Sequence, residues 1–225
     1  MLVACVPLLL LLTTCAPVLT APTTSHYNYL DLVLQWHSGV CYNKRCTDQT
    51  DPPSWTLHGL WPSISYTSCP QNCAGSRCSL DVTSLPVELV SEMEVKWPSF
   101  WRGYLDKWFW KHEYCKHGTC AADILPDAED YFNKTLELLD RANMDGVLRE
   151  AGVVPSENPY NVSEVQQAIH HTLGLQTARF WCRHYDGKQV LHEISLCVNK
   201  TFQFIDCPGG WHYRACDEDT PFYFV

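Results

Sequence analysis

The sequence predicts an α+β fold: a single disulfide-stapled domain with a central antiparallel sheet and several helices packed around it. Three observations predict it. Apolar, β-rich segments lie near both ends of the chain, amphipathic segments of helical period lie in the middle, and the 225 residues include 13 cysteines. A hydrophobic fraction of 46% is enough for one sizeable core, and neither a repeat nor a domain boundary interrupts residues 22–225.

The first 21 residues have the pattern of a secretory signal peptide, with a leucine run at residues 8–12 followed by small residues. We expect cleavage between residues 16 and 24, which leaves residues 22–225 as one domain. The leucine run is too short to cross a membrane, and no later segment is long and apolar enough. The prediction is a secreted or lysosomal protein that is not inserted in a membrane.

The cysteines agree with this oxidising route. Cys5 and Cys15 would leave with the signal peptide, so 11 of the 13 would remain, and at least one thiol is unpaired or pairs outside the chain. Asn133, Asn161 and Asn199 each begin an Asn-x-Ser/Thr sequon, and we expect them to carry glycans.

The predicted strands occur at both ends of the domain. Tyr29–Trp36 is largely apolar and β-rich, and Trp55–Pro62 is a second short strand that follows a turn cluster at residues 51–54. Three further strands are predicted near the C-terminus, at residues 178–185, 189–198 and 201–206. Asp186-Gly187 supplies the turn between the first two of these.

The predicted helices occupy the middle of the chain. The first begins with a proline in its first turn and ends before the Trp97-Pro98 pair. Amphipathic periodicity predicts the others. The four expected ranges are Pro86–Lys96, Asp127–Arg141, Met144–Ala151 and Val162–Leu173.

The run from Phe109 to Cys120 carries the densest chemistry in the chain. If it is helical, each residue turns roughly 100° from the last, so four residues share a face about 140° wide: His112, Glu113, Lys116 and His117. Two imidazoles, a carboxylate and an ammonium on one face can transfer protons and stabilise an anion. Taken alone, the run would also fit a solvated, charged helix face.

A second histidine lies in the Trp55–Pro62 segment. Among its large apolar neighbours, His58 alone would more often be a core residue, as would Trp61. Two histidines in separate motifs nevertheless suit metal-free cleavage of RNA, because one can remove the proton of the ribose 2′-OH while the other protonates the departing 5′-oxygen. The product is a 2′,3′-cyclic phosphate, and DNA, which lacks the 2′-OH, should not be cut.

At these two motifs the sequence resembles the T2 family of acid, transferase-type ribonucleases. The family's hallmark segments are similar to Trp55–Pro62 and Phe109–Cys120. The resemblance extends from the Leu32–Trp36 strand and Cys41 to the cysteines at positions 197, 207 and 216, which is nearly the whole mature chain. It implies an endoribonuclease that acts on single-stranded RNA with low base specificity.

By this resemblance, His58, Glu113 and His117 match the family's catalytic residues. His117 would be the general base and His58 the general acid, while Glu113 would polarise or orient its neighbours. His112 and Lys116 would bind the phosphate. The spacing alone does not say which histidine is the base.

The resemblance also points to base-binding residues. Trp61 and Phe109 match aromatic positions on which bases stack. Ser63 departs from the acidic residue that often follows the Trp-Pro pair and helps to read a base, so the base preference stays open. Three more residues fall near positions that line nucleotide pockets in relatives: Gln35, Phe100 and Trp101.

Four disulfides are suggested by the same resemblance: Cys41–Cys46, Cys69–Cys120, Cys182–Cys216 and Cys197–Cys207. Among the remaining cysteines, Cys73 and Cys78 are close enough in sequence to close a small loop. Cys115 would then be a free thiol beside the catalytic face.

The net charge bears on the partner and the working pH. The formal charge is −9 with neutral histidines, whereas proteins that bind polyanions by bulk charge are usually basic. Protonation of all 10 histidines would bring −9 to +1, near about pH 5 for ordinary histidines. We therefore expect local binding of RNA and an acidic optimum, between about pH 4 and 6.

Two alternatives remain in view. The His112-Glu113-x-x-x-His117 pattern is similar to a zinc-hydrolase motif with one residue too many, which sets the two histidines about 140° apart on a helix, too far to share a metal. We expect no metal, no other cofactor and a monomer. The alternative function is a secreted binding or signalling protein on a ribonuclease scaffold, with catalysis secondary.

Overall fold

The computed structural model describes residues 26–44, 46, 55–65, 68–209 and 216–225. The expected signal peptide and the turn cluster at residues 51–54 lie outside this part of the chain.

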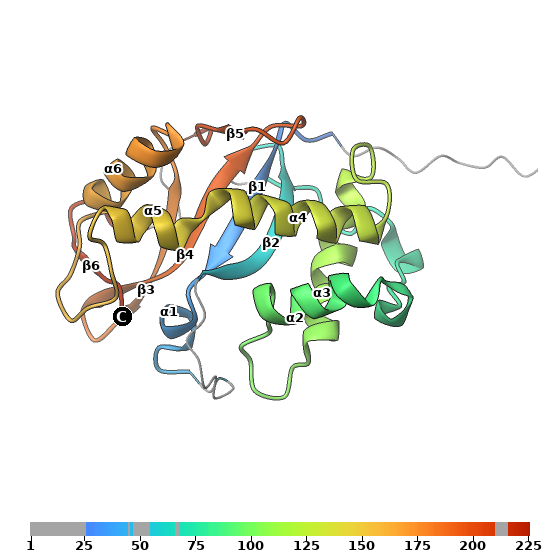
Figure 1. The fold of residues 1–225 in the computed structure, drawn as a ribbon, viewed down its shortest axis with the longest axis horizontal. Coiled ribbons are helices and arrows are strands. Elements are labelled where there is room, and N and C mark those ends of the chain that lie inside the picture. Colours follow the sequence, from blue (N-terminus) through green and yellow to red (C-terminus); the bar gives the residue numbers. More distant parts are fainter. Residues whose placement is uncertain (1–25, 45, 47–54, 66–67, 210–215) are drawn as a thin grey trace, which may run out of the picture.

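A largely antiparallel sheet forms the centre of the molecule (Figure 1). Its main strands, in order across the sheet, are β2 (Thr56–Ser63), β1 (Tyr29–Gln35), β4 (Lys188–Val198) and β3 (Arg179–Tyr185). Two short strands also pair with β4: β5 (Phe204–Ile205) antiparallel and β6 (Phe222–Tyr223) parallel. Both ends of the chain therefore build one sheet, as predicted, and only β6 lacked a sequence signal.

The central strand β1 lies between β2 and β4, and all 7 of its residues are buried. Its one charged residue, Asp31, accepts a hydrogen bond from the Ser63 hydroxyl at 2.7 Å and pairs with the Arg179 guanidinium. The predicted turn between β3 and β4 is confirmed, since Asp186 and Gly187 both have left-handed φ angles, of 47° and 78°.

The α-helices of the described residues are α1 (His37–Cys41), α2 (Val87–Lys96), α3 (Asp106–Lys116), α4 (Ala128–Ala142), α5 (Met144–Glu150) and α6 (Val162–Leu173). Short 3-10 turns occur at η1 (Gly75–Arg77), η2 (Val82–Ser84) and η3 (Gly118–Ala121). The four helices predicted in the middle of the chain are confirmed, while α1 was not predicted. Figure 1 shows α4 crossing one face of the sheet, with α2 and α3 on the β2 side and α5 and α6 toward β3.

Hydrogen bonds from buried aromatic side chains fix β2 against these helices. The Tyr131 hydroxyl of α4 accepts from the Leu60 N–H at 3.3 Å and donates to its carbonyl at 3.1 Å. The Trp97 indole donates to the His58 carbonyl at 2.9 Å, and the Trp110 indole of α3 donates to the Trp97 carbonyl at 2.7 Å. The two segments with the predicted chemistry, β2 and α3, are thereby joined through the core.

Three of the expected disulfides are present: Cys41–Cys46, Cys182–Cys216 and Cys197–Cys207. The expected Cys69–Cys120 pair is wrong. Cys120 is bonded to Cys73, and Cys78 is bonded to Cys115. Among the described cysteines, the free thiol is therefore Cys69, and neither the Cys73–Cys78 loop nor a free Cys115 occurs.

The position of the 72–78 loop explains this correction. The Asn72 N–H donates to the Lys116 carbonyl at 2.8 Å, so the loop lies along the last turn of α3. The η1 turn then carries the chain along the helix, which brings Cys73 to Cys120 and Cys78 to Cys115. Cys69 precedes this loop and remains unpaired.

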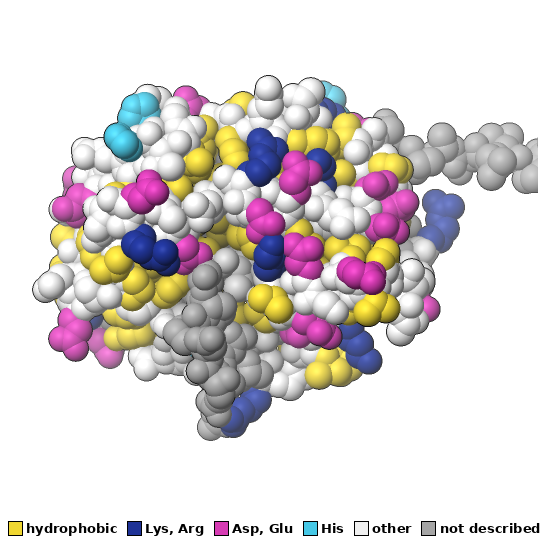
Figure 2. Space-filling model, in the orientation of Figure 1, with side chains coloured by type: hydrophobic (Ala, Val, Ile, Leu, Met, Phe, Trp, Pro, Cys, Tyr) yellow, Lys and Arg dark blue, Asp and Glu magenta, His cyan; other side chains and the backbone are white. Residues whose placement is uncertain are grey.

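Acidic and basic side chains are interspersed on the face that α4 covers (Figure 2). Lys96 of α2, for example, contacts Glu92 at 2.7 Å and Asp140 of α4 at 2.6 Å. The described residues seen on this face form no extended basic patch, in keeping with the formal charge of −9. In the described part of the chain, no helix is long and apolar enough to cross a membrane.

The three sequons differ in their surroundings. Asn133 and Asn161 are exposed, while Asn199 is half-buried and its side chain accepts backbone N–H groups of Thr201 and Gln203 within one turn. Glycans at these positions stay a prediction.

Candidate active site

An open cavity of about 510 Å³ lies between β2 and α3. Eight of the ten residues that the sequence proposed for catalysis and substrate binding line it, together with three others. The lining residues are His58, Trp61, Cys69, Gln71, Trp101, Tyr104, Phe109, His112, Glu113, Lys116 and His117.

His58 reaches the cavity from an irregularity in β2. Val33 of β1 pairs with Gly59, and Leu34 pairs with Leu57, so His58 has no partner on β1. A bulge of this kind interrupts the alternation of a strand and re-aims the side chain. Leu57 accordingly stays in the core, whereas the His58 side chain is 30% exposed.

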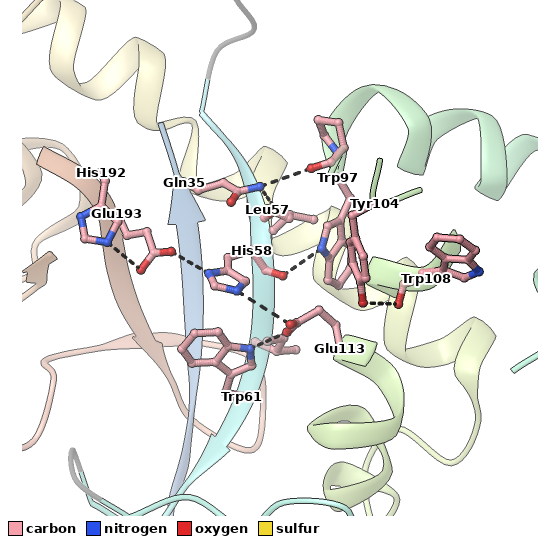
Figure 3. A network of polar contacts seen from close by, with 12 residues as sticks. Gln35, Leu57, His58, Trp61, Trp97, Tyr104, Trp108, Glu113, His192 and Glu193 are labelled. Atoms are coloured by element: carbon pink, nitrogen blue, oxygen red, sulfur yellow. Dashed lines mark hydrogen bonds and ion pairs between the residues drawn. The ribbon is translucent and has the colours of Figure 1, made fainter. Parts of the chain in front are cut away.

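A largely buried carboxylate, that of Glu193, is hydrogen-bonded to one nitrogen of His58. Glu193 lies on β4, on the other side of β1, and its Oε1 is 2.7 Å from His58 Nδ1 (Figure 3). Because a carboxylate accepts, Nδ1 carries the hydrogen and Nε2 is left for the cavity. On that side Nε2 is 3.8 Å from Oε1 of Glu113.

The two carboxylates govern the charge of His58. Burial disfavours the imidazolium, but Glu193 and then Glu113 outweigh it and raise the pKa of His58 to about 8. In return, His58 lowers the pKa of Glu193 although burial opposes this. His58 is therefore protonated through neutral pH.

Glu113 comes from α3 and is almost fully buried. The Trp61 indole donates to its Oε2 at 2.8 Å. Gly59 leaves room for this contact, since a Cβ on Gly59 would lie 2.4 Å from Glu113 Oε2 and 2.5 Å from Trp61 Nε1. Burial raises the pKa of Glu113, while His58 and the Trp61 hydrogen bond act in the opposite direction.

His117 directly follows α3 and is buried. Its backbone N–H donates to the Glu113 carbonyl at 2.9 Å, and its ring stacks on Trp61 with centroids 4.9 Å apart. No described residue gives its buried Nδ1 a hydrogen-bond partner. Burial, with the charges of Lys116 and His58, lowers the pKa of His117 to about 3, so this imidazole is neutral.

The remaining residues of the predicted helix face also reach the cavity. His112 is exposed and Lys116, the last residue of α3, is half-buried. Burial and the neighbouring charges of Lys116 and His58 lower the pKa of His112. All four residues of the predicted helix face therefore line one cavity, although α3 ends at Lys116 and His117 is the residue that follows it. The η3 turn begins at Gly118.

Three residues singled out from the sequence do not line the cavity. The Gln35 amide is buried and donates to the Leu57 and Pro98 carbonyls at 3.0 and 3.4 Å. Phe100 is buried with its ring against His37. Ser63 is turned to Asp31 of β1. A direct contact of these side chains with a nucleotide is not part of the proposal below.

Sequence reasoning missed three residues that contact the site: Glu193, Tyr104 and Gln71. It also expected Cys69 in a disulfide, whereas Cys69 is a free thiol that lines the cavity. Glu193 is the one acidic residue in the otherwise largely buried strand β4, which was the signal available. Tyr104 and Gln71 lie in irregular segments, where no periodicity indicates which way a side chain points.

One group of potential metal ligands lies close together in the described residues: Asp31, Cys197 and Cys207. The two cysteines form a disulfide, so this group lacks the thiolates that a metal would bind.

The chain is similar to known proteins over most of its length. Residues 27–207 match the model of the Ribonuclease T2 family. Ribonuclease Oy of Magallana gigas is 32% identical over 206 residues, which cover 88% of this chain and 96% of that protein. Ribonuclease T2 of Danio rerio is 34% identical over 235 residues, covering 93% and 92%. The structure of RNase NT in complex with 5′-AMP is similar at a TM-score of 0.77 and 31% identity, covering 89% and 98%.

Proposed function

Because this chain belongs to the ribonuclease T2 family and is an endoribonuclease, we propose that it cleaves single-stranded RNA by metal-independent transphosphorylation, leaving a 2′,3′-cyclic phosphate. One observation carries the proposal. The same cavity holds a histidine whose pKa is about 8 and another whose pKa is about 3, so an acid and a base coexist between these values.

His117 is the general base. Its imidazole is neutral above about pH 3, and with Nδ1 buried the other nitrogen, Nε2, accepts the proton of the 2′-OH. The freed 2′-oxygen attacks the adjacent phosphorus. The stack on Trp61 keeps the ring of His117 in one orientation.

His58 is the general acid. Its Nδ1–H is held by Glu193, so its Nε2–H donates a proton to the 5′-oxygen as the P–O5′ bond breaks. The products are a 2′,3′-cyclic phosphate and a 5′-hydroxyl. A deoxyribose offers no nucleophile for this step, so DNA is not a substrate.

Two further groups stabilise the negative charge on the crowded phosphorane, and a third orients the site. Lys116 and protonated His112 face the cavity from α3 and would bind the phosphate oxygens. Glu113 orients the site, because it accepts from the Trp61 indole and lies 3.8 Å from His58. A depressed pKa of His112 means that its charge is present only toward acidic pH, which favours an acidic optimum.

Base specificity is low in this proposal. Phe109, Trp101 and Tyr104 offer aromatic faces to the cavity, and stacking accepts any base. Trp61 has less freedom to take a base, since its ring lies between His58 and His117 with each centroid 4.9 Å away. The signal-like N-terminus, the sequons and the disulfides support a secreted or lysosomal location, and we propose that the protein acts there as a monomer.

The test is an assay on a dinucleotide RNA in an excess of chelator. We expect cleavage to a cyclic phosphate, and none of the same dinucleotide with a 2′-deoxyribose before the scissile bond. Loss of activity in chelator, or cleavage of the deoxy compound at a similar rate, would contradict the mechanism.

A further inference from the structure

A row of exposed aromatic side chains continues outward from the catalytic cavity. Trp101, Tyr104 and Trp108 are 42%, 38% and 49% exposed, and together they are called the aromatic ledge below. Among the large hydrophobic side chains of the described residues, half of the exposed ones lie between residues 101 and 108, with Leu105 as the fourth. Such a concentration beside a cavity indicates a surface that binds something.

The aromatic ledge is joined to the site. Trp101 and Tyr104 line the cavity, whereas Trp108 lies outside it. Trp108 contacts Tyr104, with ring centroids 6.0 Å apart and a hydrogen bond from the Tyr104 hydroxyl to the Trp108 carbonyl at 3.2 Å. In Figure 3 this pair lies on the α3 side of the His58–Glu113 contact.

The backbone under the aromatic ledge is held in place. The Tyr104 N–H donates to the Trp101 carbonyl at 3.0 Å, and Asp106, at the start of α3, accepts from the Ser99 N–H at 2.6 Å. A β-bridge joins Trp101 to Cys46, next to the Cys41–Cys46 disulfide. The rings are therefore carried on a preorganised support.

The segment that carries the aromatic ledge is predominantly basic, although the chain as a whole has a formal charge of −9. Arg102, Lys107 and Lys111 are all exposed within this segment. The one acidic residue between positions 99 and 112 is Asp106, which is half-buried and accepts a hydrogen bond from the Ser99 N–H. Aromatic rings interleaved with cations are the combination that binds single-stranded nucleic acid, through base stacking and phosphate contacts.

We propose that the aromatic ledge is an additional subsite for single-stranded RNA, on which nucleotides beyond the two at the scissile bond stack. The RNA leaves the cavity along Tyr104, and its next base stacks on Trp108. Lys107 and Lys111 contact the phosphates of this part of the RNA. The proposal rests on the proposed function, since the occupant is the continuation of the substrate.

The test compares substrates that share one scissile bond. A dinucleotide is compared with oligonucleotides that extend it on the 5′ or the 3′ side. In these oligonucleotides all sugars except the ribose before the scissile bond are 2′-deoxyriboses, so that only one bond can be cut. We expect an extension on one side to raise kcat/KM on the order of 10-fold through KM, which is the scale of one stacked base. In Trp108→Ala that gain should disappear, while Trp108→Phe should keep most of it.

Leu105→Ala is the matched control, because Leu105 is as exposed as Trp108 but has no aromatic face. Leu105→Ala should leave the gain in kcat/KM on extension unchanged. If Leu105→Ala lost this gain as fully as Trp108→Ala, the segment would be a general apolar surface that binds a protein, and the proposal would be wrong. The double variant Lys107→Ala, Lys111→Ala should reduce the salt dependence of kcat/KM for the extended oligonucleotide, but not for the dinucleotide. If the dinucleotide is cut but extension brings no gain in kcat/KM, the subsite proposed for the aromatic ledge is wrong and the proposed function stands. If the dinucleotide is not cut, the proposed function itself is wrong.

Discussion

At the scale of single residues, the proposed mechanism depends on two histidines that differ in charge. Both imidazoles contact Trp61, but only His58 has a carboxylate on its Nδ1. His117 is buried beside cations and loses its proton instead. The sequence could supply the two histidines, through their motifs, but not this difference. Glu193 is 135 residues from His58 in the chain, and only the register across β1 brings them together.

The role of Glu193 can be tested with Glu193→Gln. The amide keeps the size of the side chain but removes its charge, so the pKa of His58 should fall from about 8. The alkaline limb of the kcat/KM profile should move to lower pH with it, and the histidine resonances in an NMR titration should report the same shift. Glu88→Gln, on the exposed side of α2, should move neither. An unchanged alkaline limb would remove Glu193 from the mechanism.

Gly59 predicts a second residue effect. In Gly59→Ala the new methyl group would lie 2.4 Å from Glu113 Oε2 and 2.5 Å from Trp61 Nε1, so one of these side chains must move. Because a small displacement of catalytic groups is costly, kcat should fall about 10–100-fold with a smaller change in KM. Gly187→Ala, in the β3–β4 turn with φ of 78°, should lower Tm but keep kcat. A Gly59→Ala enzyme with full kcat would mean that Glu113 needs no fixed position.

At the scale of elements, the helices other than α1 and most of the strands follow from local sequence patterns. The α3 face was predictable because residues four apart share one side of a helix, whatever the rest of the fold does. The bulge that re-aims His58 was not, since it exists only in the pairing of β2 with β1. The disulfide error has the same origin: the 72–78 loop is placed by a backbone contact to the end of α3, which no local spacing reveals.

The corrected cysteine framework makes a direct prediction. Peptide mapping of the unreduced protein should find Cys73 joined to Cys120 and Cys78 joined to Cys115. Alkylation of the native protein should label Cys69, the half-buried thiol at the cavity, and nothing else among the described cysteines. Recovery of a peptide that links Cys69 to Cys120 would show that the loop is placed differently.

At the scale of the whole molecule, net charge and site act together. A chain with a formal charge of −9 repels RNA at neutral pH, and protonation of its histidines weakens that repulsion. The composition thus predicted that binding is local and favoured by acid. The local cations were visible in the sequence, but only the fold shows that Arg102, Lys107 and Lys111 are exposed in the same segment as an exposed aromatic row next to the cavity.

The pH dependence follows from the two histidines. In the proposed mechanism, His58 loses its proton as the pH rises through about 8, and the general acid is lost. As the pH falls toward about 3, His117 gains a proton and the proposed general base is lost. Within that window, the charge on His112 and the weaker repulsion of RNA favour the acidic half. We expect kcat/KM for a dinucleotide at constant ionic strength to be greatest between about pH 4 and 6. A maximum above pH 7 would contradict the contribution of His112.

The division of labour between His58 and His117 is the central claim, and a substrate with sulfur in place of the bridging 5′-oxygen tests it most directly. A thiolate leaves without a proton, so this substrate needs a base but no acid. On ordinary RNA, His58→Ala and His117→Ala should each lose at least about 100-fold in kcat. On the sulfur substrate, His58→Ala should recover nearly the wild-type rate and His117→Ala should not. Recovery of His117→Ala instead, or of neither variant, would contradict the assignment of His58 as the acid.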